Sequence, residues 1–175
     1  MSKARTARIA AAAVCVALAA PAAHAQRVSP HETHEFVVDG AKITISYGRP
    51  SMRGRKIFGA LIPYNKVWMP GADEATVFES SAALQFGDFK LPSGRYSFYT
   101  MPSDKQWTLI INKKTGQWHT LYVPDEDLAK LPMTAEPLPA PVEQLTISAV
   151  PQAPGGAIRL EWENTRFSVP FTVVR

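Results

Sequence analysis

Apolar and polar residues alternate along most of this sequence, and that two-residue period constrains the fold more than any other feature. In residues 41–47, Ile43, Ile45 and Tyr47 alternate with polar residues, and residues 157–163 repeat the pattern. Successive side chains of a β-strand point to opposite faces, so this alternation is typical of half-buried strands. Because Gly and Pro turns separate many such segments, we predict an all-β chain. The expected architecture is a single-domain antiparallel β-sandwich, or an open barrel, with one short helix and a long loop between early strands.

The turn residues define where the strands begin and end. Asp39-Gly40 predicts a hairpin, because both central positions of such a turn need positive φ. Apolar residues on both faces of 106–112 indicate a central strand. Trp107 and Trp162 alternate with aliphatic residues and are expected in the core. The expected strands cover residues 35–38, 41–47, 75–79, 83–86, 89–91, 95–101, 106–112, 117–123, 142–150, 157–163 and 167–174.

Three segments depart from the alternation. Residues 125–131 begin with acids and end near a lysine, which predicts one or two helical turns. Residues 132–141 contain four prolines and predict an extended connection that crosses between the two sheets. Residues 164–166 are Asn-Thr-Arg and predict a turn before the last strand.

The first 25 residues have the pattern of a secretory signal peptide. Lys3, Arg5 and Arg8 form a basic start, and residues 9–20 form an apolar run that is too short to span a bilayer as a helix. An Ala-His-Ala cleavage sequence follows, so we predict cleavage after Ala25 and a periplasmic or secreted protein. We divide the chain into this signal (1–25), an N-terminal segment with the first strand (26–40) and the β-sandwich domain (41–175).

Removal of the signal changes which functions the composition allows. The chain has 19 Lys and Arg residues against 15 Asp and Glu. Three of these cations lie in the signal, which leaves 16 against 15, so no general attraction to nucleic acid is expected. The single Cys, Cys15, also lies in the signal, which removes disulfides and cysteine chemistry from the remainder. We expect no integral membrane segment after the signal and no cofactor.

The connection at residues 48–76 is the candidate functional segment. Long irregular connections in compact domains are usually functional or disordered, and this one has too many large apolar residues to be disordered. Its arginines suit anionic groups, and its acids lie on the return to the sheet. Aromatic residues at loop edges stack on sugar rings or cap the end of a sandwich. The candidate binding residues are Arg49, Arg53, Arg55, Trp68, Asp73, Glu74, Thr76 and Trp118.

The role of the loop arginines has two interpretations. They bind a ligand, or they pair with Asp73 and Glu74 and so fix the loop against the sheet. Arginines that pair with these acids would give the loop a purely structural role, whereas unpaired arginines would favour binding of a ligand.

Five stretches in order resemble the bacterial domain-of-unknown-function 2911 family. They are ITISYGRPSMRGRKIFGALIPYNKVW, PGADEAT, LPSGRYSFYTMP, WTLIINKKTGQW and IRLEWENTRFSVPF. The resemblance covers residues from about 41 to the C-terminus and implies an exported all-β protein, without a reaction, substrate or cofactor. The family commonly has Trp-Arg before a Gly-Ala-Asn-Glu-Ala-Thr element. Here Trp68 is followed by Met69-Pro70 instead, and Asp73 stands where the family usually has Asn.

No constellation in the sequence predicts catalysis or metal binding. His31, His34 and His119 are the histidines outside the signal, and their spacing matches no usual ligand set. Adjacent Asp73 and Glu74 point to opposite faces if they lie on a strand, so they rarely flank one bond. We assign no catalytic residues.

Three functional hypotheses remain open. The first is a non-catalytic module that binds a small ligand, a glycan or an envelope protein through the 48–76 loop. The second is a carboxylate-dependent enzyme that acts on cell-envelope carbohydrate, with Glu74 as acid or base. The third is a purely structural component of the envelope.

Overall fold

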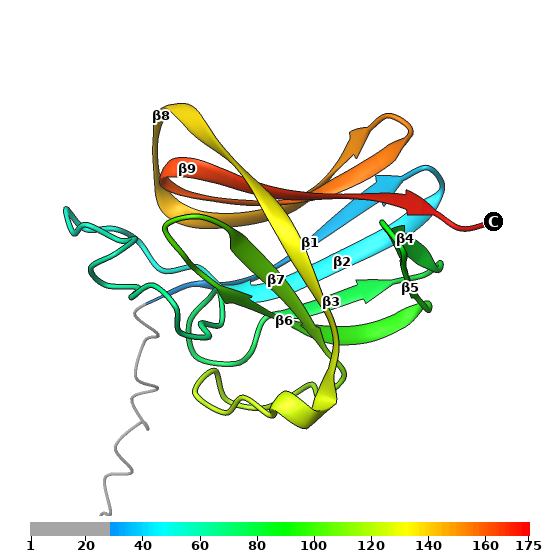
Figure 1. Cartoon of the computed structure of the whole chain (residues 1–175), viewed down its shortest axis with the longest axis horizontal. Coiled ribbons are helices and arrows are strands. Elements are labelled where there is room, and N and C mark those ends of the chain that lie inside the picture. Colours follow the sequence, from blue (N-terminus) through cyan, green and yellow to red (C-terminus); the bar gives the residue numbers. More distant parts are fainter. Residues whose placement is uncertain (1–28) are drawn as a thin grey trace, which may run out of the picture.

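The computed structural model describes residues 29–175, which form one antiparallel sheet of nine strands (Figure 1). The strand order is β1-β2-β3-β6-β7-β8-β9-β4-β5. The predicted signal peptide (1–25) lies outside the described residues. The elements are β1 (His31–Val38), β2 (Ala41–Gly48), β3 (Val77–Ser80), β4 (Leu84–Phe86), β5 (Phe89–Leu91), β6 (Gly94–Met101), β7 (Trp107–Asn112), the 3₁₀ turn η1 (Pro124–Glu126), β8 (Asp127–Gln152) and β9 (Gly155–Val173).

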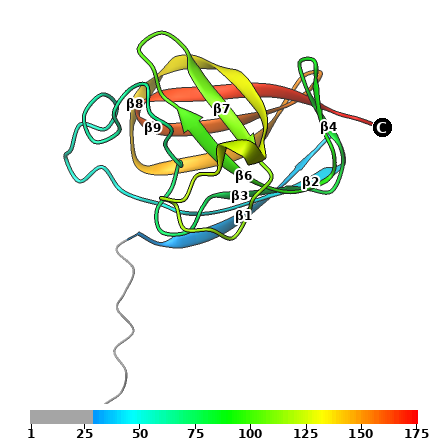
Figure 2. The same ribbon diagram turned by 60° about the horizontal axis from the view of Figure 1, so that its bottom comes forward.

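The two longest strands fold the sheet over on itself. β8 first pairs with β7, and from Thr134 onward it pairs with β9. The register between β8 and β9 shifts between Pro137 and Thr146, where the strand bends. In Figures 1 and 2 the β8–β9 ribbon consequently lies over the layer that contains β1, β2 and β3. The backbone N–H of Ile147 in β8 donates to the Tyr47 hydroxyl of β2 at 2.7 Å, which joins the two layers.

The core fills the space between these layers. Alternate residues of β2 are buried, as its sequence period requires. Phe58, from the long loop, meets Trp107 and Phe167 edge-on, with ring centroids 4.8 and 5.5 Å away. Trp107 and Trp162 are buried, so both predictions of core tryptophans are confirmed. The predicted all-β fold, an antiparallel sandwich or open barrel, is also confirmed.

The Asp39-Gly40 hairpin is confirmed in detail. Both turn residues have positive φ, at 46° and 80°, and β1 pairs with β2 along its whole length. β1 belongs to the predicted N-terminal segment 26–40, and it is one of the two edge strands of this sheet.

The predicted strand at 117–123 is wrong. The place beside β7 is taken by the first part of β8, so residues 113–123 cross the end of the sheet as a loop. Gln117 is buried and donates to the Tyr99 hydroxyl at 2.7 Å. This segment has one isolated backbone bridge, between Trp118 and Glu74.

The last third of the chain contains longer strands than its turn residues predict. Residues 164–166 continue β9 and do not form a turn. The backbone departs from extended geometry one residue earlier, at Glu163, which has a φ of 56°. The predicted helix at 125–131 is wrong beyond η1, because residues 127–131 pair with β7. The proline-rich segment 132–141 is extended and passes between layers, but it does so as part of β8.

Candidate functional site

Residues 49–76 emerge from the end of β2, project beyond the sheet and return to β3 (Figure 1). The part of the loop that leaves β2 and the part that returns to β3, which we call the return leg, enclose a cavity of about 490 Å³. We call this cavity the loop pocket. Four of the predicted site residues line it, together with His119 and the core residue Trp162. The predicted four are Arg53, Arg55, Trp68 and Asp73.

Arg49 does not line the loop pocket, because its side chain is built into the fold. Its guanidinium donates to the Leu145 carbonyl at 3.0 Å, to Glu32 Oε2 at 2.8 Å and to Thr146 Oγ1 at 2.9 Å. The Arg49 side chain is 17% exposed. Its hydrogen bond holds the pKa of Glu32 below the usual value. Arg49 therefore connects β1, β8 and the start of the loop, and its acid partner is Glu32 rather than Asp73 or Glu74.

Arg55 is held by the backbone of its own loop. Its Nε donates to the Met52 carbonyl at 2.9 Å and its Nη2 to the Ser51 carbonyl at 2.7 Å. These acceptors are neutral, so they orient the guanidinium without cancelling its charge. Arg53 lies two residues earlier with a φ of 51°, and its backbone N–H donates to Glu143 Oε1 at 2.8 Å.

Two tryptophans form the aromatic part of the loop pocket. Trp68 stacks on Trp162 with ring centroids 6.1 Å apart and an interplanar angle of 18°. The Trp162 indole N–H donates to the Glu143 carbonyl at 3.1 Å, and the Trp68 backbone pairs with Thr100 of β6. The position of Trp68 is thus fixed from both the core and the sheet.

The return leg positions Asp73 and His119 together. His119 Nδ1 lies 2.7 Å from the Asp73 carbonyl oxygen, and the His119 backbone N–H donates to the same carbonyl at 2.9 Å. A carbonyl only accepts, so Nδ1 carries a proton and Nε2 is the acceptor of the neutral ring. Asp73 has a φ of 67°, which turns the chain here. Sequence reasoning treated His119 as an isolated histidine, because its proximity to Asp73 arises from the loop at 113–123.

Thr76 and Trp118 have different surroundings from the other predicted residues. Thr76 is buried and donates to the Pro70 carbonyl at 2.5 Å, so it stabilises the return leg. Trp118 is 51% exposed and lies beside His119, with ring centroids 5.5 Å apart, but it does not line the loop pocket.

Glu74 faces a different pocket from its neighbour Asp73. We call this cavity of about 330 Å³ the strand pocket, because it is lined by His31 of β1, Ser46 of β2 and Arg95 of β6 as well as Glu74. His31 Nε2 lies 3.0 Å from Ser46 Oγ, and His31 Nδ1 lies 3.6 Å from Glu74 Oε2. Sequence reasoning gave Ser46 no role, since it is one of several polar residues on the outer face of β2.

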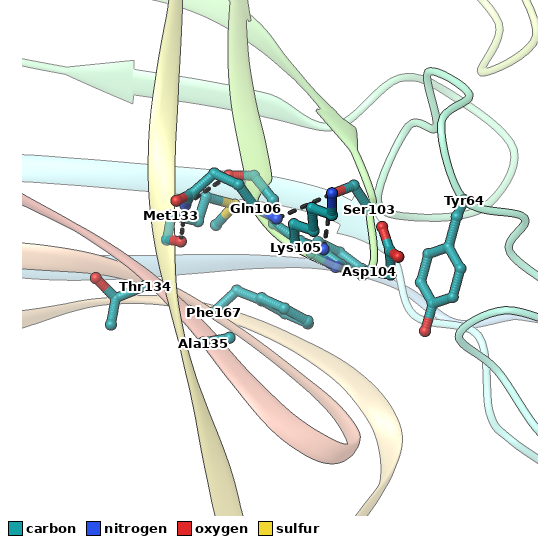
Figure 3. A pocket seen from close by; sticks show the side chains of 10 residues that line it. Tyr64, Ser103, Asp104, Lys105, Gln106, Met133, Thr134, Ala135 and Phe167 are labelled. Carbon is teal, nitrogen blue, oxygen red and sulfur yellow. Dashed lines mark hydrogen bonds between the residues drawn. The ribbon is translucent and has the colours of Figure 1, made fainter.

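A third cavity, of about 460 Å³, lies at the rim of the sheet (Figure 3). Ser103 Oγ accepts from the backbone N–H groups of Lys105 and Gln106, and the Gln106 side chain donates to the Met133 carbonyl at 2.7 Å. Tyr64 lies on the opposite side of the cavity from Met133 in Figure 3. The hydrogen bonds to Ser103 Oγ stabilise the turn at 103–106.

Within residues 29–175, no three His, Cys, Asp or Glu side chains gather as a metal-ligand set. That region also contains no helix with the length and hydropathy that a membrane crossing requires.

Comparison with known proteins gives one match. No curated protein and no solved structure matches the chain significantly. The model of the family described as "Protein of unknown function (DUF2911)" matches residues 29–171, which include eight complete strands and all but the end of β9. The match spans far more than half of the chain and agrees with the motifs in the sequence. The chain therefore belongs to the DUF2911 family.

Proposed function

We propose that this protein is exported and that its loop pocket is a non-catalytic binding site for a small anionic ligand with a sugar-like or other flat face. The amino-terminal sequence supports export. The loop pocket supports binding, because its size lies in the range of small-molecule sites and it combines aromatic walls with a few polar groups.

The observation that carries this proposal is the way in which the Arg55 guanidinium is hydrogen-bonded. Within residues 29–175 this guanidinium donates to two backbone carbonyls and to no carboxylate, so its positive charge remains on the wall of the pocket. A guanidinium that is oriented but not neutralised is suited to a carboxylate, which accepts two parallel hydrogen bonds from it. Trp68 and Trp162 supply the aromatic surface, and the His119 Nε2 acceptor suits a ligand hydroxyl.

The structure does not favour the pairing of Asp73 and Glu74 as an acid and base on one sugar bond. Asp73 lines the loop pocket, and Glu74 lines the strand pocket. Carboxylates that cleave a glycosidic bond flank the same bond from opposite sides. This separation does not support the carbohydrate-cleaving alternative.

Galacturonic acid and galactose are suitable probes, because they differ mainly in the carboxylate. We expect the protein to bind galacturonate more tightly, and Arg55→Gln to weaken that binding by about tenfold or more, as the loss of a charge-assisted hydrogen bond implies. Lys56→Gln is the matched control. It makes the same change of charge on the next residue, which lies outside the pocket, and should leave the affinity nearly unchanged.

Titration calorimetry on the three proteins measures these affinities. Equal weakening by Arg55→Gln and Lys56→Gln would mean that the net charge of the loop, rather than a site, attracts the anion. The proposed function would be contradicted if the protein bound neither galacturonate nor any member of a wider panel of organic anions.

A further inference from the structure

The strand pocket holds three side chains in the order of a nucleophilic triad. Ser46 Oγ lies 3.0 Å from His31 Nε2, and His31 Nδ1 lies 3.6 Å from Glu74 Oε2. A hydroxyl within hydrogen-bond reach of an imidazole whose other nitrogen lies near a carboxylate has the arrangement of such a site, whatever the order in the sequence. We propose that Ser46, His31 and Glu74 form an esterase-like site for short acyl esters. This inference does not rest on ligand binding in the loop pocket.

The antiparallel register explains why these residues meet. Thr33 of β1 lies directly opposite Ser46 of β2. His31 precedes Thr33 by two residues, so both side chains project from the same face of the sheet. Ser46 is also opposite Val77 of β3, and Glu74 lies on the chain that leads into β3. The site is therefore assembled on regular strands, with its carboxylate on the adjoining return leg.

The hydrogen bonds around Ser46 are consistent with one assignment of protons. Thr33 Oγ1 lies 2.9 Å from Ser46 Oγ. Ser46 has a single proton, and if it donates to His31 Nε2, the Thr33 hydroxyl donates to the Ser46 oxygen. His31 then carries its own proton on Nδ1, toward Glu74. This is the tautomer that a general base needs, and the Thr33 hydroxyl stabilises the oxygen as it loses its proton.

The pocket is accessible to a substrate. The side chains of His31 and Glu74 are 30% and 38% exposed. Val77, Ala75 and Gly116 line the cavity with small groups, and Arg95 adds a positive charge. The volume of about 330 Å³ favours a short acyl group, and the Arg95 charge favours the oxyanion that forms when a carbonyl is attacked.

The reaction proceeds by acyl transfer in two steps. Ser46 Oγ bonds to the carbonyl carbon of the ester while its proton moves to His31 Nε2. The carbon–oxygen bond to the leaving alcohol then breaks, and the alcohol takes that proton from His31. Water, deprotonated by His31, attacks the acyl-serine and releases the acid, which regenerates Ser46 with its proton. Glu74 acts as a positioning residue that orients the imidazole and stabilises its charged form.

A fluorophosphonate probe tests the site directly, because an activated serine displaces its fluoride and keeps the phosphonate. We expect the purified protein to gain one phosphonate, located on Ser46 by peptide mass spectrometry, and Ser46→Ala to gain none at this position. His31→Gln should slow labelling by about 100-fold or more, the usual contribution of a general base. Thr44→Ala, on the same face of β2, is the matched control and should label at the normal rate.

Further variants separate the roles of the individual residues. Glu74→Gln should slow labelling of Ser46, and Glu74→Asp should restore part of the rate, which a purely structural role would not produce. Lys56→Gln, which lies outside both the loop pocket and the strand pocket, should leave labelling unchanged. Absence of a phosphonate on Ser46 in the unmodified protein, or labelling that is indifferent to His31→Gln, would overturn the proposal.

Discussion

Replacement of Arg49 by Ala is expected to lower the free energy of unfolding by roughly 2–3 kcal/mol. The guanidinium makes three hydrogen bonds, to Glu32, Thr146 and the Leu145 carbonyl. Removing it takes a donor away from the Leu145 carbonyl, the Thr146 hydroxyl and the Glu32 carboxylate, at a position where the arginine is mostly shielded from water. Chemical denaturation in urea measures the change.

Arg55→Ala is the matched control for this experiment. It removes the same side chain from the same loop, but Arg55 is exposed, and within the described part of the chain it bonds only to carbonyls within four residues. We expect a loss below about 1 kcal/mol. Equal losses in the two variants would contradict the distinction between a structural arginine and a binding arginine.

Replacement of Trp162 by Ala is expected to lower the free energy of unfolding by more, about 3–5 kcal/mol, as is usual when a large aromatic side chain is removed from a core. Trp162 is 1% exposed, stacks on Trp68 and donates to the Glu143 carbonyl. The substitution therefore creates a cavity, removes a hydrogen bond and opens the floor of the loop pocket. Urea denaturation gives the loss of stability.

Trp118→Ala makes the same change at an exposed position and serves as the control. We expect its stability to stay within about 0.5 kcal/mol of the parent protein. A loss as large as that of Trp162→Ala would show that the loop at 113–123 contributes more to the fold than its packing indicates.

Features set by neighbouring residues could be predicted from the sequence. The Asp39-Gly40 hairpin requires only local positive φ, and the alternation in residues 41–47 defines the buried face of β2 without knowledge of its partners. Features set by distant partners could not be predicted. Residues 164–166 contain good turn formers, but pairing with β8 keeps them extended, which is a tertiary effect that overrides local preference.

The same distinction applies to the candidate sites. The loop at 48–76 was identified by its composition, and four of its predicted residues share one pocket. Neither interpretation of the loop arginines included the bonds of Arg49 to Leu145 and Thr146, because these bonds join residues 96 and 97 positions apart. Ser46 carries no local signal at all, since its proximity to His31 depends on the β1–β2 register and on the returning loop.

We propose that the loop pocket is a binding site that Arg49 holds in place and to which Arg55 contributes a positive charge. The four tryptophans provide the most direct test. Each indole N–H gives its own signal in a two-dimensional nitrogen–proton NMR spectrum, and galacturonate can be titrated while all four are followed. Trp68 and Trp162 line the loop pocket, whereas Trp107 and Trp118 do not. We expect saturable shifts of the Trp68 and Trp162 signals that disappear in Arg55→Gln. Shifts confined to Trp107 or Trp118, or shifts that persist unchanged in Arg55→Gln, would contradict this proposal.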